Sequence, residues 1–456
     1  MRNLRVVLVL AGVLAGALRA VAAGEPEGRA ETTTRRDLEG EVRELLSGLS
    51  SAVREERSLA EKRLLELGPR VLPLLPAPEL LPSASVRETV RRVRIELERN
   101  AARESVLPAR VTVSGALSVR ETLGEVARQT GNRLDVSLLP AKLLERTIEV
   151  EFKSASFWEA IDDLADRLDC RYEFDNAGRG LKLQVLEGQP RPASSAVAHG
   201  GAFRIEALPA DRIRRGAGRP LDQKLRRHDD LLRVTLLLMP EPRLRPLFLQ
   251  FAARDVSAHL ATGAELRPFS PEASYELPLG ESGSLSRIQL EYLLPETVPG
   301  TAFKLKGKIR CMTAAGSESV RFTDLAEVPE GRGIARRRGG VTVTLNRVRG
   351  TPSSPGKTEA RLRVSVAYDA GGPAFESHQT WILHNEVFLE DNDGRKMRLN
   401  GGSETTRQGD GAVAIEYRFV DLPEPLSRYE FVYVVPTLII DVPVEFEIQS
   451  ALVKKP

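Results

Sequence analysis

The chain alternates between segments with an apolar residue at every third or fourth position and segments with an apolar residue at every second position. The first pattern is typical of amphipathic helices and the second of half-buried strands. Helical spacing dominates the N-terminal part, both patterns follow in turn over the next 80 or so residues, and strand patterns separated by Pro and Gly dominate the rest. The sequence therefore predicts a multidomain α+β protein, with an N-terminal helical hairpin at 35–104, a small βαβ-βαβ domain at 109–186, and two C-terminal antiparallel β-sandwiches at 201–328 and 340–453.

The helical hairpin is predicted from two apolar stripes that a proline-rich bend separates. Apolar residues recur at alternating spacings of four and three from Leu38 to Leu49, and the run continues to about Leu67. The segment GPRVLPLLPAPELLP then holds prolines that a helix interior excludes. Ser85-Val-Arg-Glu88 has the sequence of a capping box and is expected to begin the second helix. Residues 50–104 weakly resemble a single helical-repeat unit of the HEAT kind.

The segment 109–186 reads as two similar strand–helix–strand halves. RVTVS and TIEVEF alternate as strands, and each is followed by a capping-box sequence, Ser118-Val-Arg-Glu121 in the first half and Ser156-Phe-Trp-Glu159 in the second. Gly131 is expected to end the first helix. The second helix has an apolar stripe from Phe157 to Leu168. Because one strand–helix–strand unit cannot bury such a stripe alone, we expect both helices to cover one shared sheet.

This segment resembles the STN domain (secretin and TonB N-terminus). The resemblance rests on SVRETLGEVARQTGNRLDV, TIEVEFKSASFWEAIDDLADRLDCRYEF and LKLQV. Thr130-Gly131, Ala160-Ile161, Leu164 and Tyr172 occupy the places that the family pattern marks. The resemblance implies a place in the bacterial envelope and a role in protein–protein docking, since the family's domain occurs in outer-membrane secretion channels and in receptors that signal to an anti-sigma regulator. It implies no catalytic residue and no cofactor.

The β-rich part holds an apparent internal repeat. LRVTLLL at Leu232 echoes LRVSVAY at Leu362, and LEYLLPE at Leu290 echoes IEYRFVDLPE at Ile415. We therefore expect the two sandwiches to be copies of one unit. GQPRPASSAVAHGGA and VPEGRGIARRRGG are predicted to be linkers by composition, with phosphate binding as an alternative for GIARRRGG.

The N-terminus has the three parts of a secretory signal peptide. Arg2 and Arg5 precede the apolar run Val6–Leu18, and small residues surround Ala23. The run is shorter than the roughly 20 residues that span a bilayer, so we expect residues 1–23 to be cleaved near Ala23 and the chain to be periplasmic or extracellular. A retained anchor is the alternative. Loss of the leader brings the net charge from +3 to about zero, which argues against nucleic acid as a partner.

Cysteine and histidine give little sign of chemistry. Cys170 and Cys311 fall in different predicted domains, so two buried thiols are expected and a disulfide is the alternative. Among the histidines at 199, 228, 259, 378 and 384, only His378 and His384 are close in sequence. Six positions along a strand separate them by about 20 Å, which is too far to share a metal ion.

Two acidic groupings have a structural and a functional interpretation. Asp391, Asp393 and Gly394 begin a calcium-loop pattern, but Gly402 stands where an acidic ligand is needed, so a hairpin turn is preferred. Acidic residues also cluster on the predicted helix after Ser156, where a solvated face near the helix N-terminus is preferred over paired catalytic carboxylates. They are Glu159, Asp162, Asp163 and Asp166.

No catalytic sequence motif is found, and the sequence predicts a non-enzymatic exported envelope protein that docks a protein partner. No cofactor and no metal are expected. Trp158 is expected either to cap the edge of the core or to contact the partner, and Trp381 is expected in a core. The alternatives are a binding module for an envelope glycan or small ligand, and a hydrolase with a dispersed site in the β domains.

Overall fold

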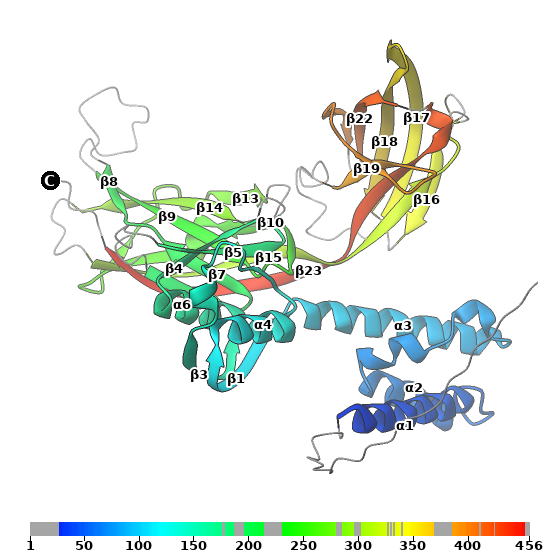
Figure 1. The fold of residues 1–456 in the computed structure, drawn as a ribbon, viewed down its shortest axis with the longest axis horizontal. Coiled ribbons are helices and arrows are strands. Elements are labelled where there is room, and N and C mark those ends of the chain that lie inside the picture. The colour runs from blue at the N-terminus through cyan, green and yellow to red at the C-terminus, as the bar shows by residue number, and fades with distance from the viewer. Residues whose placement is uncertain are drawn as a thin grey trace, which may run out of the picture. The chain divides into compact units, whose positions relative to one another are not determined.

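The structure is a computed structural model that is rich in strands and also contains helices, so the predicted α+β multidomain class is confirmed at this coarse level (Figure 1). Two compact units divide the chain, 1–101 and 102–456. The residues that the structure describes are 27–175, 178–186, 196–213, 230–279, 285–295, 302–325, 328, 331, 333–338, 341–368, 385–409, 412–423 and 425–451.

The first unit is helical. It contains α1 (Glu27–Gly48), α2 (Arg54–Glu66), two short 3-10 turns at Pro69–Leu74 and Pro78–Leu80, and most of α3 (Ala84–Ser105). The stripes predicted from the sequence form its core, in which Val42, Leu64, Val90 and Leu97 are buried.

Two local predictions for this unit need correction. The chain breaks between α1 and α2, where the Ser51 hydroxyl accepts a hydrogen bond from the Val53 backbone, so the first helical segment is two helices. The start of α3 lies one residue before the predicted capping box, and the hydroxyl of Ser83, not that of Ser85, accepts a hydrogen bond from Val86 N at 3.5 Å.

Residues 109–186 form an α+β unit whose strands divide into two sheets and not one shared sheet. β1 and β3 pair antiparallel as a two-stranded sheet, while β5 lies between β2 and β4 in a three-stranded sheet. Both sheets and both long helices contribute to a single core. The elements are β1 (Arg110–Ser118), α4 (Val119–Thr130), β2 (Arg133–Asp135), α5 (Ala141–Leu144), β3 (Thr147–Ser156), α6 (Phe157–Arg167), β4 (Cys170–Phe174) and β5 (Gly180–Val185).

The sequence of α6 explains why two sheets are needed. Phe157 and Trp158 are adjacent and both fully buried, although they point about 100° apart around the helix. The predicted stripe through Ile161 and Leu164 is also buried, which confirms it as a core face. A helix with so wide an apolar arc cannot be covered by one sheet face. The capping boxes at Ser118 and Ser156 and the left-handed Gly131, with φ 69°, are present as predicted.

The remaining strands surround two β cores, each between two sheets that pack face to face. The two cores share an eight-stranded sheet that contains β15 and β23. The first core lies between one part of this sheet and the sheet β14-β9-β7-β6. The second core lies between the other part and the sheet β16-β17-β18-β22-β21. The strands are β6 (Ala196–Gly200), β7 (Phe203–Ala207), β8 (Asp211–Ile213), β9 (Asp230–Pro240), β10 (Arg245–Ala252), β11 (Val256–Leu260), β12 (Glu265–Leu266), β13 (Ser274–Pro278), β14 (Ser286–Leu294), β15 (Ala302–Phe322), β16 (Ile334–Arg338), β17 (Val341–Ser354), β18 (Lys357–Tyr368), β19 (Val387–Asp391), β20 (Lys396–Arg398), β21 (Ser403–Gly409), β22 (Ala412–Leu422) and β23 (Tyr429–Ala451).

β15 and β23 belong to both β cores. They pair antiparallel over almost their whole length, from Ala302 opposite Ala451 to Phe322 opposite Phe431. The first half of β15 and the last half of β23 face the first core, and their other halves face the second. The residues that β15 and β23 contribute to the first core are Phe303, Leu305, Ile309, Cys311, Val442, Val444, Phe446 and Ile448, and those in the second are Met312, Ala314, Val320, Phe322, Tyr429, Phe431, Tyr433 and Val435.

The buried side of each strand changes near its midpoint. In β15 the change falls between Cys311 and Met312, which are neighbours in sequence but lie in different cores. Successive side chains of a strand point to opposite faces, so the two cores use opposite faces of this ribbon. In β23 the change includes Leu438, a non-glycine residue with φ 51°. The interval 340–453, assigned from the sequence to the second sandwich, therefore also supplies part of the first core.

Candidate functional site

A polar cluster joins the α+β unit to the β6–β7 hairpin, and we call it the junction cluster: Asp162, Tyr172, His199, Arg204 and Glu206. The Asp162 carboxylate, on α6, accepts a hydrogen bond from the Tyr172 hydroxyl on β4 and contacts His199 Nε2 at 2.8 Å. Arg204 Nε lies 3.0 and 3.1 Å from the two oxygens of that carboxylate, and its Nη1 donates to Glu206 at 2.6 Å.

The local fold explains how these side chains meet. His199 on β6 and Arg204 on β7 are directly opposite each other in the antiparallel register, so their side chains emerge on the same face. The Arg204 guanidinium also stacks over the Tyr172 ring, 5.6 Å from its centroid. The predicted linker is therefore wrong for residues 196–200, which form β6. Its preceding residues, up to 195, lie outside the described part of the chain.

Asp162 also corrects the prediction of a solvated acidic face. Its side chain is 23% exposed and surrounded by donors, whereas Asp166 on the same helix is exposed. Nothing in the helical spacing distinguishes the two residues. The partners that bury Asp162 are 37 and 42 positions away along the chain, and the first of them, His199, lies in a segment that the composition predicted to be a linker.

In the junction cluster, Asp162 and Arg204 each stabilise the charged form of the other. Burial alone raises the pKa of the Asp162 carboxyl, but the His199 hydrogen bond and the Arg204 charge outweigh it and hold that pKa below its usual value. Burial and the Asp162 charge raise the pKa of Tyr172, so its hydroxyl keeps the proton and remains a donor. Burial lowers the pKa of Arg204, but negative neighbours including Asp162 reverse this effect and raise it overall.

Trp158 lies inside the core of the α+β unit and is not accessible to a partner. Its side chain is 0% exposed and packs against the rings of Phe157 and Tyr172, with centroids 5.1 and 5.8 Å away. Among the described residues, its indole Nε1 has no hydrogen-bond partner. The alternative of Trp158 as a partner-facing anchor is therefore wrong for this structure, because α6 is covered on both sides.

A second polar contact joins the α+β unit to the end of β9. Glu241 is fully buried and accepts hydrogen bonds from Ala109 N at 2.9 Å, Asn132 Nδ2 at 3.1 Å and Arg243 Nε at 2.7 Å. Arg243 in turn donates to the backbone carbonyls of Ser105 and Leu107. Burial raises the pKa of Glu241, and the three donors only partly oppose that effect. The two contacts together attach the unit through charged groups that satisfy one another.

This arrangement favours attachment over catalysis. Both oxygens of Asp162 are occupied by donors, so its carboxylate is not free to accept a substrate proton. In the described part of the chain, no group of three or more His, Cys, Asp or Glu side chains is placed to hold a metal ion. His228, His378, His384 and Trp381 lie outside the described residues, and His259 lies on β11.

The cysteines and the Asp391 turn are as expected. Cys170 and Cys311 are unpaired and buried in different cores, and burial raises the pKa of both thiols, to about 12 for Cys311. β19 and β20 form a hairpin in which the Asp391 carboxylate accepts hydrogen bonds from the backbone of Asp393 and Arg395. Asp391 therefore stabilises the predicted hairpin turn.

An open hollow of 610 Å³ lies on the sheet formed by β11, β15 and β23. Its polar lining includes His259, Lys304, Lys306 and Glu447, and Phe303 contributes apolar surface. Lys304 and Glu447 form an ion pair at 2.5 Å. The hollow therefore offers both signs of charge.

The leader predicted for residues 1–23 lies outside the described residues. In the described part of the chain, we find no helix that combines the length and the hydrophobicity of a membrane-spanning segment. Comparison of the chain with family models and with curated proteins found no match.

Proposed function

We propose that this chain is an exported, non-enzymatic protein of the bacterial cell envelope that docks a protein partner through its STN-like α+β unit, with a helical hairpin and two β-sandwiches as its other domains. The observation that carries the proposal is the attachment of this unit by two polar contacts, around Asp162 and Glu241. Because the polar groups of both contacts bind one another, they hold the α+β unit as a rigid platform. The outer surface of the unit can then bind another protein.

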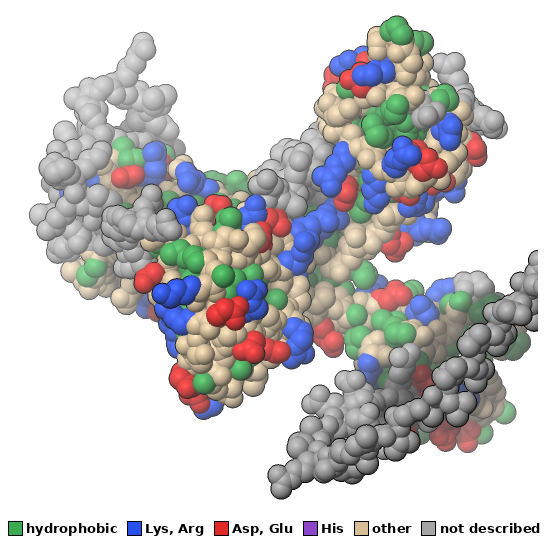
Figure 2. Space-filling view, in the orientation of Figure 1, with side chains coloured by type: hydrophobic (Ala, Val, Ile, Leu, Met, Phe, Trp, Pro, Cys, Tyr) green, Lys and Arg blue, Asp and Glu red, His purple; other side chains and the backbone are tan. Residues whose placement is uncertain are grey.

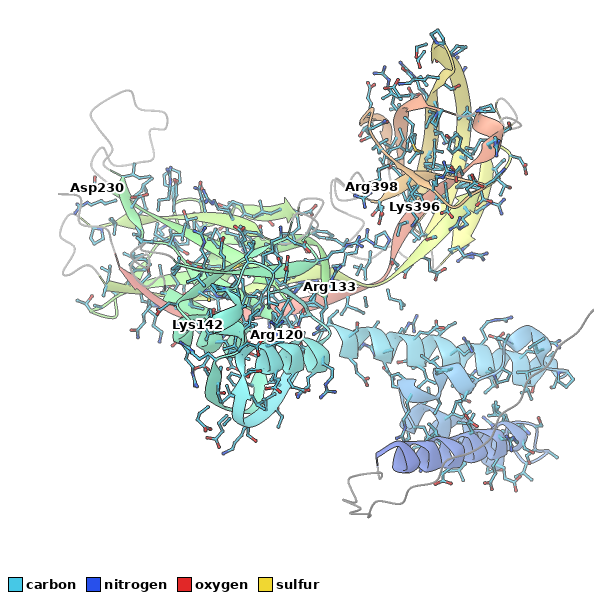
Figure 3. All side chains as sticks on the ribbon, in the orientation of Figure 1. Arg120, Arg133, Lys142, Asp230, Lys396 and Arg398 are labelled. Carbon is cyan, nitrogen blue, oxygen red and sulfur yellow. The ribbon has the colours of Figure 1, made fainter. Side chains whose placement is uncertain are left out.

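The connection from β2 to α5 is the part of that surface that best suits docking. Leu138 on this connection is 53% exposed, and among the described residues of 109–186 it is the exposed large apolar side chain. Arg133 on β2 and Lys142 on α5, the two elements that this connection joins, are both exposed and lie well apart in Figure 3. An exposed apolar side chain on a surface that also carries cations suits a partner with an apolar contact area and an acidic rim.

The surface charge supports a protein partner over a nucleic acid. Basic and acidic side chains are interspersed on the face shown in Figure 2, without a broad field of one sign. Nucleic-acid binding needs a concentrated basic surface, because neutralisation of phosphates supplies most of the affinity.

Site-specific photo-crosslinking tests the proposal. A photoreactive amino acid is placed at Leu138 of the full chain and, as a control, at Leu285. Leu285 immediately precedes β14 and is 50% exposed. We expect one envelope protein to crosslink from position 138 in living cells of the source bacterium and not from position 285. Crosslinking that is equal from both positions, or absent from both, contradicts the proposal.

The hollow beside Lys304 and Glu447 favours a second candidate function, the binding of an envelope glycan or small ligand. Thermal-shift measurements on the full chain against envelope glycans test it. A ligand that raises the melting temperature of the wild type, and not of a Lys304→Glu variant, supports this function.

A further inference from the structure

We propose that an extended acidic segment of a partner protein binds in a groove between β15 and β16, which we call the arginine groove. Its lining consists of Ser319, Val320 and Arg321 from β15, and Ala335, Arg336, Arg337 and Arg338 from β16. Both strands pack against the second β core at this place, and the groove has a volume of 390 Å³. The segment GIARRRGG was predicted to be a linker, but residues 334–338 form a strand that pairs with β17.

In the described part of the chain, each of the two strands beside the groove has an edge without a paired strand. β16 is the last strand of its sheet and pairs only with β17 among the described strands. β15 pairs with β10 only as far as Ala314, and beyond that residue its one described partner is β23. Such edges present backbone N–H and C=O groups that an added strand can use.

The charge of the groove selects an acidic occupant. Four of its seven lining residues are arginines and none is acidic. Arg321 also reaches Glu390 and Glu430, at 3.2 and 3.1 Å. In the described part of the chain, Arg338 has no carboxylate partner, and Arg336 contacts the ring of Phe322 at 5.7 Å. A guanidinium fork binds a carboxylate through two parallel hydrogen bonds, so these arginines suit Asp and Glu side chains.

The groove fits a peptide better than another kind of polyanion. Ala335 lies among these arginines and is exposed, so it adds a small apolar surface to the groove. A strand alternates its side chains between two faces, so a segment that alternates acidic and small apolar residues matches both features at once. A phosphate or sulfate polymer makes no use of the two strand edges.

Binding of a labelled peptide to the full chain tests this proposal. The probe is a fluorescein-labelled peptide of four Glu-Val repeats, followed by fluorescence anisotropy, and a peptide of four Gln-Val repeats measures the contribution of charge. We expect the acidic peptide to bind at least tenfold more tightly than the neutral one, and to weaken as salt is raised. The double variant Arg336→Glu/Arg338→Glu is expected to lose at least tenfold in affinity.

Arg254→Glu is the matched control, because Arg254 is 71% exposed on another part of the chain. It is expected to bind the acidic peptide like the wild type. Equal binding of the acidic and neutral peptides overturns the proposal. So does a loss of affinity in Arg254→Glu as large as that in Arg336→Glu/Arg338→Glu. Tighter competition by inorganic polyphosphate than by unlabelled acidic peptide overturns it in favour of a general polyanion site. None of these outcomes depends on crosslinking from Leu138.

Discussion

Arg233 on β9 lies directly opposite Glu291 on β14, and the guanidinium contacts the carboxylate at 2.7 Å. The same relationship recurs in the second β region, where Arg363 on β18 lies opposite Glu416 on β22 at 3.3 Å. Leu232, which precedes Arg233, lies opposite Tyr292, which follows Glu291. In the same way, Leu362 precedes Arg363 and lies opposite Tyr417, which follows Glu416. The repeat predicted from the sequence is therefore present as the same pairing register in both regions.

This repeat makes the arrangement of β15 and β23 understandable. β15 follows β14 in the first copy, as β23 follows β22 in the second. Each long strand begins in the core of its own copy and ends in the core of the other. The two copies thus exchange equivalent strand ends within one chain, an arrangement related to domain swapping between subunits.

The exchange predicts that the two β cores unfold together. Val444→Ala removes buried volume from the first core and Val320→Ala from the second, and each is expected to cost about 2 kcal/mol. Because both strands cross both cores, either variant should lower the urea midpoint of one common transition. Hydrogen exchange with mass spectrometry measures this as equal loss of protection in peptides from both cores. Leu64→Ala, in the helical unit, serves as the control and should leave that transition unchanged. Loss of protection confined to the substituted core contradicts the prediction.

Asp162→Asn is expected to destabilise the junction by about 2 kcal/mol at neutral pH, because it leaves His199 and Arg204 without a buried carboxylate. The folded-state pKa of Asp162 is lowered, so the stability that this carboxylate contributes is present above its unfolded pKa of about 3.9. It is lost as the pH falls through the lower folded value. Urea unfolding of both proteins from pH 7 to pH 3 measures the difference.

Below about pH 5, the gap between the wild type and Asp162→Asn should shrink as the pH falls. Asp166→Asn, an exposed change one turn along the same helix, should shift stability by less than about 0.5 kcal/mol. A gap between the wild type and Asp162→Asn that widens as the pH falls below about 5 would show that the carboxylate does not stabilise the junction in its charged form.

Glu241→Ala is expected to cost about 3–5 kcal/mol, because it leaves the Arg243 charge and the Asn132 amide without their buried acceptor. Amide exchange should rise at Ala109, whose N–H also loses its acceptor. Glu272→Ala is the control, since that side chain is 90% exposed. A loss in Glu241→Ala no larger than in the control would show that the contact does not hold the α+β unit in place.

Leu438→Asn is expected to stabilise the chain by up to about 1 kcal/mol. Leu438 has φ 51°, a conformation that costs most side chains about 1–2 kcal/mol and that Asn adopts more readily. Its side chain is 39% exposed, so little buried apolar surface is lost. Leu285→Asn, at an exposed position without a positive φ, should give no gain in thermal unfolding. Equal effects of both substitutions would show that the backbone at 438 is not strained.

Local sequence determined the elements whose causes lie within a few residues. Ser118 and Ser156 form capping boxes because the partner of each cap is three positions away, and Gly131 ends α4 because glycine tolerates a left-handed conformation. The stripe on α6 and the turn after Asp391 were predictable for the same reason. The register of the internal repeat was visible because both copies kept the same short motifs.

No local pattern predicts which distant segments meet, because long-range packing brings them together. The burial of Asp162 depends on His199 and Arg204, and no local pattern connects an acidic helix face with a later hairpin. The separation of the α+β strands into two sheets, and the exchange of strand ends between β15 and β23, have the same origin. Alternation shows that a strand has a buried face, but the core that covers this face is chosen by packing over the whole chain.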